Sequence, residues 1–73
     1  MNTPKNKYEY CTLNWIWSEG NIRLTFPNAD ERLQKGSYKE IVQTLNELGE
    51  NGWEVVGCVG VVNWVYWTLR RFI

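Results

Sequence analysis

Two cysteines are the side chains of this 73-residue sequence that come closest to catalytic chemistry. A nucleophilic Cys11 or Cys58 would need a base or a cation to lower the pKa of its thiol. The chain contains no histidine, the commonest general base and metal ligand, and both cysteines fall in apolar segments. We therefore expect two free thiols, no catalytic residue, no metal or cofactor site, and a protein that is not an enzyme.

Adjacent arginines among aromatic residues suggest a second chemistry, which is stacking on the bases of single-stranded nucleic acid. The residues of such a platform are Trp64, Tyr66, Trp67, Arg70, Arg71 and Phe72. Eight acidic and eight basic residues cancel, however, so no net field attracts a polyanion. The sequence therefore favours a core or interface role for these aromatics, and nucleic acid is the less favoured partner.

The remaining polar motifs favour structural roles. Gly49 and Gly52 follow a helical pattern, whereas the glycines of a phosphate-binding loop precede a helix. Glu54 has Arg70 as a cross-strand partner and no second carboxylate at a fixed spacing. The charged residues 30–32 are typical of a solvated loop.

The segment from Ser37 to Val56 predicts one helix and the start of one strand. Ser37 and Glu40 form a capping-box pattern, which marks the beginning of a helix. Apolar residues then recur at helical spacing, namely Tyr38, Ile41, Val42, Leu45 and Leu48. The helix is predicted from Tyr38 to about Asn51.

Gly52 predicts how this helix ends. If Gly52 is the first residue beyond the helix cap, Trp53 and Leu48 occupy the two positions that contact each other in a Schellman motif. Trp53 then closes the helix and opens the next strand. We expect Ser37, Glu40, Leu48, Gly49, Gly52 and Trp53 to be the structural residues of this junction, and Trp53 to matter most to the fold.

The first part of the chain predicts a hairpin. Residues 7–17 and 22–26 are rich in aromatic and β-branched residues and flank a turn at residues 18–21. One register places six apolar residues on one face, as the pairs Trp17–Ile22, Trp15–Leu24 and Leu13–Phe26. Polar residues 27–36 predict a loop, of which residues 29–34 could form one helical turn.

A second hairpin is predicted after the helix, with strands at residues 53–59 and 64–72 joined by residues 60–63. Pairing of Gly60 with Trp64 sets Glu54 opposite Arg70. The face expected to pack against the helix then consists of Val55, Val59, Val65, Trp67 and Leu69.

The element order predicts an α+β fold of the type β-β-α-β-β. One helix packs on one face of a four-stranded antiparallel sheet, which makes a two-layer sandwich. The expected spatial strand order is 2-1-3-4, with the third strand beside the first. We expect a single domain at residues 7–73, preceded by a flexible N-terminus at residues 1–6.

The run Leu45–Val56, LNELGENGWEVV, resembles the signature of a small, mainly bacterial family that is catalogued as a domain of unknown function, number 4177 in that series. Residues 8–10 resemble the opening strand of that family, and residues 68–71 resemble its closing strand, which tends to end in a basic pair. Residues 15–35 depart from the family pattern. The resemblance supports the fold and implies no reaction, cofactor or catalytic residue.

The aromatic content exceeds what one helix on a small sheet can cover. Five Trp, four Tyr and two Phe each bring a large apolar surface. If Glu9 points to solvent, the apolar face of the first hairpin points away from the helix and adds to a large exposed patch. Alternatively, a bulge near Cys11 turns that face under the helix.

These observations favour a non-enzymatic interaction module that self-associates, most simply as a homodimer. The expected interface residues are Leu13, Trp15, Trp17, Ile22, Leu24, Phe26, Trp64 and Tyr66. The alternative is a small binding domain for single-stranded nucleic acid or a flat ligand that uses Trp64, Tyr66 and Arg70 for stacking. With no signal peptide or membrane span in the sequence, we expect a cytoplasmic protein with no membrane partner.

Overall fold

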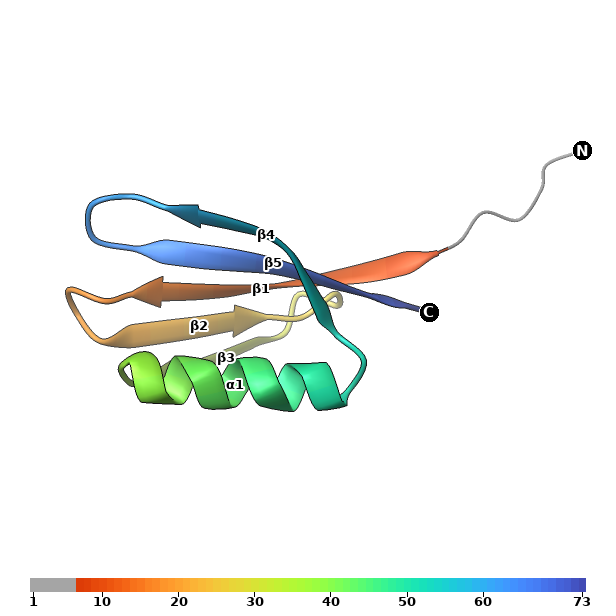
Figure 1. Ribbon diagram of the computed structural model, residues 1–73, viewed down its shortest axis with the longest axis horizontal. Helices are drawn as coiled ribbons and strands as arrows, with labels where there is room; N and C mark the ends of the chain where they lie inside the picture. Colours follow the sequence, from red (N-terminus) through yellow and green to blue (C-terminus); the bar gives the residue numbers. More distant parts are fainter. Residues whose placement is uncertain (1–6) are drawn as a thin grey trace, which may run out of the picture.

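The computed structural model describes residues 7–73, and the predicted flexible segment 1–6 lies outside the described residues. The elements are β1 (Tyr8–Ile16), β2 (Asn21–Thr25), β3 (Glu31–Lys35), α1 (Tyr38–Glu50), β4 (Glu54–Gly60) and β5 (Val65–Phe72) (Figure 1). All pairings in the sheet are antiparallel, and its strand order is β3-β2-β1-β5-β4. The α+β class with one helix on an antiparallel sheet is confirmed, but the sheet has five strands and not four.

The predicted strand order 2-1-3-4 is wrong, because β5 and not β4 lies beside β1. Helix α1 ends near the start of β1, so the chain re-enters the sheet at the end where β1 begins (Figure 1). Strand β4 therefore runs in the same direction as β1. The chain runs opposite to β1 only after the turn between β4 and β5. Strand β5 can therefore pair antiparallel with β1, from Tyr8 to Trp15.

The predicted loop at residues 27–36, with its helical turn at 29–34, is replaced by a turn and strand β3. The turn is closed by hydrogen bonds from the Phe26 N–H to the Asp30 carbonyl, 2.8 Å, and from the Ala29 N–H to the Phe26 carbonyl, 2.9 Å. Strand β3 is polar because it is an edge strand, exposed over most of its length. Period-2 apolar patterning, which revealed the other strands, is absent from such a strand.

The first hairpin has the predicted face but not the predicted register. Leu13 pairs with Leu24 and Trp15 with Ile22, so the pairing differs from the prediction by two residues. The turn closes through Gly20, which has a φ of +69° that favours glycine. Asn21 therefore begins β2 one residue earlier than expected, and Trp17 lies in the turn.

The apolar face of this hairpin lies under the helix. Strand β1 pairs with both neighbours without a register shift, so this arrangement does not need the bulge near Cys11 that the sequence offered as an explanation. Had Glu9 pointed to solvent, Tyr8, Tyr10 and Thr12 would have faced the helix, but these three residues lie on the outer face. The outward alternative is wrong because Glu9 does not point to solvent but bonds to Arg71 on the helix side of the sheet. The buried core consists of Cys11, Leu13, Trp15, Ile22, Leu24, Ile41, Leu48, Trp53 and Leu69.

The predicted capping box forms at the start of α1. The Ser37 N–H donates to the Glu40 carboxylate at 2.8 Å, and the Ser37 hydroxyl donates to the same oxygen at 3.0 Å. These hydrogen bonds lower the pKa of Glu40. Close packing at the preceding residue leaves no room for a side chain, since a Cβ on Gly36 would lie 2.6 Å from the Glu40 Cβ.

The helix buries a slightly different stripe from the predicted one. Ile41, Thr44 and Leu48 are the buried residues, whereas Tyr38 and Val42 are exposed. Thr44 is accommodated because its hydroxyl donates to the Glu40 carbonyl, 2.8 Å. The helix is therefore rotated so that one apolar flank remains uncovered.

The predicted Schellman motif is confirmed in full. Trp53 N–H donates to the Leu48 carbonyl and Gly52 N–H to the Gly49 carbonyl, each at 3.0 Å. Gly52 has a φ of +90°, as the motif requires. Leu48 and Trp53 are both buried in the core, so the helix end is fixed by packing as well as by hydrogen bonds.

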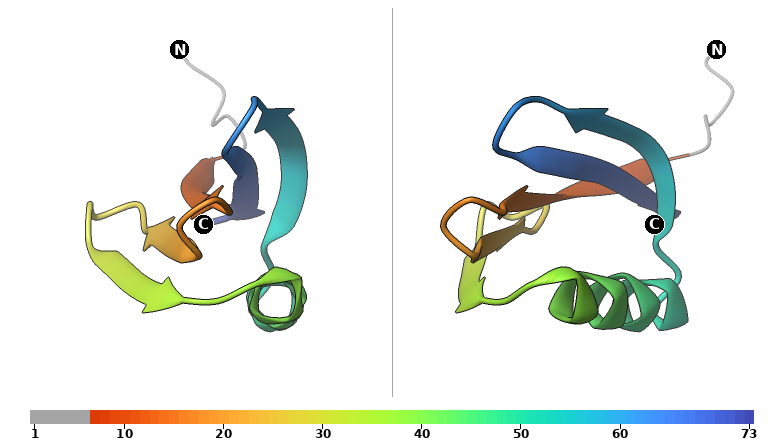
Figure 2. Two further views of the ribbon diagram at one scale, coloured as in Figure 1. Left: turned by 90° about the vertical axis from the view of Figure 1, so that its left-hand side faces the viewer. Right: turned by 60° about the vertical axis from the view of Figure 1, so that its left-hand side comes forward.

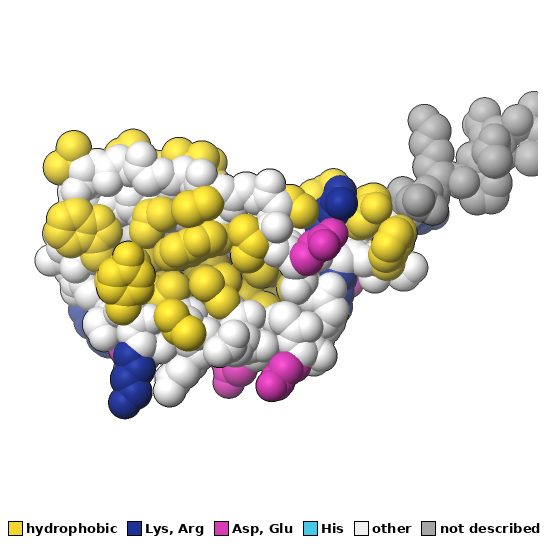
Figure 3. All heavy atoms as spheres, viewed as in Figure 1, with side chains coloured by type: hydrophobic (Ala, Val, Ile, Leu, Met, Phe, Trp, Pro, Cys, Tyr) yellow, Lys and Arg dark blue, Asp and Glu magenta, His cyan; other side chains and the backbone are white. Residues whose placement is uncertain are grey.

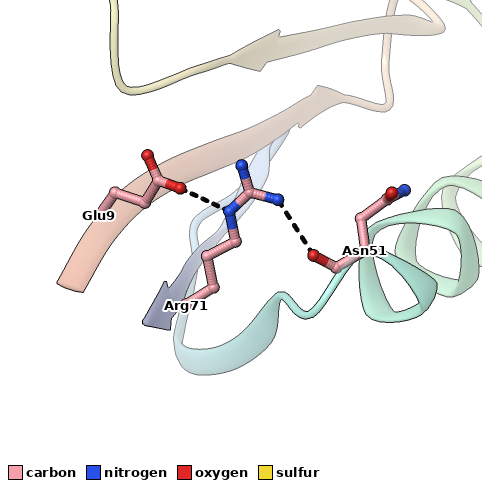
Figure 4. Close-up of polar contacts among 3 residues, drawn as sticks. All are labelled: Glu9, Asn51 and Arg71. Atoms are coloured by element: carbon pink, nitrogen blue, oxygen red, sulfur yellow. Dashed lines mark hydrogen bonds and ion pairs between the residues drawn. The ribbon is translucent and has the colours of Figure 1, made fainter. Parts of the chain in front are cut away.

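Arg71 of β5 ties this junction to the sheet (Figure 4). Its Nε donates to the Glu9 carboxylate of β1 at 2.5 Å, and its Nη1 donates to the Asn51 carbonyl at 3.0 Å. The guanidinium carbon lies 4.4 Å from the centre of the Trp53 ring, a cation–π distance. One side chain thus holds β1, β5 and the C-terminal end of α1 together.

The second hairpin keeps the predicted register at its open end only. Glu54 pairs with Arg70 and Val55 with Leu69 as expected, and Arg70 Nε lies 2.9 Å from Glu54 Oε1. A register shift between Val55 and Gly57 then moves the remaining pairs by one residue. The predicted helix-facing set is therefore corrected, because Cys58 and not Val59 shares the face of Trp67.

Trp53→Ala tests the junction. It removes a buried indole, its contact with Leu48 and the surface on which Arg71 stacks, and such truncations cost about 3–5 kcal/mol. A domain of this size holds roughly 5 kcal/mol of stability. We expect the variant to be largely unfolded at 37 °C in a far-UV circular dichroism melt. The control Glu54→Gln, at the exposed neighbouring residue, should melt close to wild type. A Trp53→Ala protein that melts at the same temperature as this control would contradict the role given to Trp53 at the end of the helix.

Candidate functional site

An open apolar hollow of about 570 Å³ lies between α1 and the second hairpin. Its lining residues are Trp15, Trp17, Tyr38, Cys58, Val65 and Trp67. Figure 3 shows the same side of the molecule as a broad hydrophobic area between α1 and β4, with charged side chains only toward its margins. We refer to these six residues as the apolar hollow.

The hollow is open because α1 covers only one half of the sheet. Figure 2 shows that the sheet curls from β3 to β4, and that α1 lies on the concave side of this curve. Every residue of β4 is exposed, including Val55 and Val59 at nearly half of their full surface. The junction at Gly52 and the contacts of Arg71 hold the helix end in this position.

Two aromatic side chains form the floor and rim of the hollow. Trp15 of β1 is 8% exposed, and the Tyr38 ring lies 5.1 Å from it between ring centres. The Trp15 indole N–H is buried and has no hydrogen-bond partner in the described part of the chain. Buried indole donors usually have a partner, so the Trp15 N–H is an exception to that pattern.

The exposed flank of α1 extends the apolar surface beyond the hollow. Tyr38 is 71% exposed and Val42, one turn further, is 50% exposed. Trp17, in the turn after β1, also lines the hollow and is 50% exposed. An apolar surface of this kind, with no charged residue among its lining, is typical of a surface that meets a partner.

The structure separates the residues that the sequence predicted as an interface. Leu13, Ile22 and Leu24 are buried under α1 and are not available at the surface, and Phe26 packs against the same core. Trp15 and Trp17 line the hollow, whereas Trp64 and Tyr66 stack on each other at 5.5 Å on the other face.

Sequence reasoning missed Tyr38, Cys58, Val65 and Trp67 as residues of this surface. It assigned Tyr38, Val65 and Trp67 to the packing between helix and sheet or to a stacking platform, and it treated Cys58 as a free thiol. A signal was present for Tyr38, since the apolar stripe of the helix was wider than one contact with the sheet needs. No signal in the sequence gave the register shift that turns Cys58 toward the hollow.

The arginines predicted as part of a stacking platform lie on opposite faces of the sheet. Arg70 is on the outer face, bonded to Glu54 and placed 4.3 Å from the centre of the Tyr8 ring. Tyr8 in turn stacks on Phe72 at 4.7 Å. Arg71 is on the helix face, so the structure does not bring the two guanidinium groups together with one set of aromatics.

The two cysteines are both free, but their surroundings differ. Cys11 is buried in the core, and this burial raises the pKa of its thiol to about 11, although the charge of nearby Arg71 acts in the opposite direction. A thiol with a raised pKa is a poor nucleophile at neutral pH. Cys58 is exposed on β4 and lines the apolar hollow.

Within residues 7–73, no group of three or more Cys, Asp or Glu side chains is placed to hold a metal ion. The described helix, α1, is not long and apolar enough to cross a membrane.

Comparison of the chain with protein-family models, with curated proteins and with solved structures finds no match.

The buried thiol of Cys11 makes a prediction about alkaline pH. The unfolded chain loses the thiol proton as the pH rises past 9.0, whereas the folded chain keeps it up to about 11. Deprotonation therefore favours unfolding in that range. We expect the stability difference between wild type and Cys11→Ala, measured by urea unfolding, to shrink from pH 9.0 to 11. Other titrating groups are common to both proteins, so parallel curves would contradict the raised pKa.

Proposed function

We propose that this chain is a small non-enzymatic interaction module whose partner surface is the apolar hollow and the adjoining flank of α1. The observation that carries the proposal is a contiguous surface without charge, open to solvent and lined by three tryptophans and a tyrosine. Aromatic residues of this kind are enriched at the centres of protein interfaces.

The position of the hollow on rigid elements supports this proposal. Its lining side chains come from β1 and the turn that follows it, from β4 and β5, and from the first turn of α1. The ends of α1 are fixed by the capping box and the Schellman motif, and Arg71 ties β1, β5 and the C-terminal end of α1 together. A surface that is already formed needs little ordering when it meets a partner, so less conformational entropy opposes binding. The resemblance to the family of unknown function implies no reaction and fits a module without catalysis.

A flat apolar ligand is the second candidate occupant of the hollow. The observation that favours it is the aromatic lining of the hollow, where the Trp15 and Tyr38 rings lie 5.1 Å apart between ring centres and offer flat apolar faces. Single-stranded nucleic acid has weaker support, because Arg70 and Arg71 lie on opposite faces and both engage groups of the same chain.

Titration with an environment-sensitive apolar dye such as bis-ANS tests the proposed surface. In protein diluted until any assembly dissociates, we expect strong dye fluorescence from wild type. The double variant Trp17→Glu/Tyr38→Glu places two charges on the rim of the hollow and should reduce the fluorescence several-fold. Glutamate is well tolerated in the first turn of a helix, so the variant should remain folded.

The control is Val62→Glu, which adds one glutamate at an 88% exposed apolar residue outside the hollow. Its dye fluorescence should equal that of wild type. Equal dye binding by the double variant and by this control would contradict the proposal that the hollow is the main apolar binding surface.

A further inference from the structure

The two edges of the sheet differ in how they are protected. Strand β3, at one edge, carries Glu31, Arg32 and Lys35. Strand β4, at the other edge, has no charged residue and no proline between Val55 and Asn63. Natural sheets block pairing with other chains by placing charges, prolines or bulges at their edges, and β4 has only a bulge near its start.

The free edge of β4 presents main-chain groups that can pair with another strand. Val61 N–H donates to the Trp64 carbonyl at 2.9 Å, so the adjacent pair of Gly60 and Val65 is of the non-hydrogen-bonded type. Because hydrogen-bonded and non-hydrogen-bonded pairs alternate in an antiparallel ladder, the N–H and C=O groups of Gly60 and Cys58 point away from β5. They point to the open edge beside the apolar hollow.

We propose that the occupant of this surface is a second copy of the chain, whose β4 pairs antiparallel with β4 of the first. This inference rests on the proposed function and names the partner. The contact is isologous, so each copy presents the same patch to the other. An edge without charge can meet itself without repulsion, and the chain carries no net charge that would keep two copies apart.

The free main-chain groups define the register. Cys58 lies opposite Gly60 of the second copy and exchanges both hydrogen bonds with it, and the two-fold axis repeats this pair. Val59 then lies opposite Val59 of the second copy, at the axis. Two uncharged β-branched side chains on the outer face are a favourable cross-strand pair.

This pairing joins two five-stranded sheets into one continuous sheet. A two-fold axis that relates antiparallel strands of one sheet is perpendicular to it, so both helices lie on the same face. The two apolar hollows then open toward each other across the seam, and each is bounded on its open side by the other copy. A stable interface needs more than about 1,000 Å² of buried surface in total, so the contact includes the exposed apolar surface around Tyr38 and Val42 in addition to the strand pair.

Sedimentation of wild type and of two matched lysine variants tests the pairing. We expect wild type at micromolar concentration to have twice the monomer mass of 8.7 kDa. Val59→Lys places a charge at the proposed axis and should halve the mass, whereas Leu33→Lys, at an exposed apolar residue of the β3 edge, should leave it unchanged. A monomeric wild type, or a dimer that survives Val59→Lys, would overturn the proposal.

Disulfide trapping tests the register. Non-hydrogen-bonded partners have Cα atoms about 4.5 Å apart, a separation that a disulfide can span. Mild oxidation of Cys58→Ser/Val59→Cys should therefore give a covalent dimer, whereas Cys58→Ser/Leu33→Cys should stay largely monomeric on the same denaturing gel. Equal cross-linking of both variants would contradict pairing through β4.

The dye titration distinguishes a failure of this inference from a failure of the proposed function. A monomeric wild type that binds bis-ANS at the hollow would leave the interaction surface in place and rule out the second copy as its occupant. A monomeric wild type that binds no dye would contradict both. A dimer in which Val59→Lys strongly increases dye binding per chain would support both.

Discussion

The position of α1 relative to the sheet depends on the junction between Leu48 and Trp53, where the helix ends. The Schellman hydrogen bonds stop the helix within one turn, and the Trp53 indole packs back on Leu48. Arg71 then fixes this junction to the start of β1 through Glu9 and to the Asn51 carbonyl. Because the end of the helix is held over β1, α1 cannot also cover β4.

The open half of the sheet follows from that constraint. A helix that were free to shift toward β4 would bury the apolar hollow, but it would have to leave Ile22 and Leu24 uncovered, which are now almost fully buried. The fold therefore covers one half of the sheet with its own helix and leaves the other half exposed, including the uncharged stretch of β4. The same arrangement accounts for the surplus of aromatic residues in so short a chain.

The sequence predicted the features that depend on local chemistry. The capping box, the glycine stop and the pair of Glu54 with Arg70 each need only residues that are close along the chain or opposite in a hairpin. The strand order was not predictable in this way, because it depends on which end of the sheet the helix reaches. Strand β3 was missed for a different reason, since an exposed edge strand carries no period-2 apolar pattern. The face that Cys58 presents depends on one bulge in β4, which no residue pattern marked.

Amide hydrogen exchange of β4, followed by NMR, tests the central claim that this edge and its hollow meet a partner of the same kind. The amides of Cys58 and Gly60 point to the free edge, whereas the amide of Val59 bonds within the sheet and serves as the internal reference. In concentrated wild type we expect Cys58 and Gly60 to be protected, and in Val59→Lys we expect both to exchange rapidly while residue 59 remains protected. Rapid exchange of Cys58 and Gly60 in concentrated wild type would contradict the account.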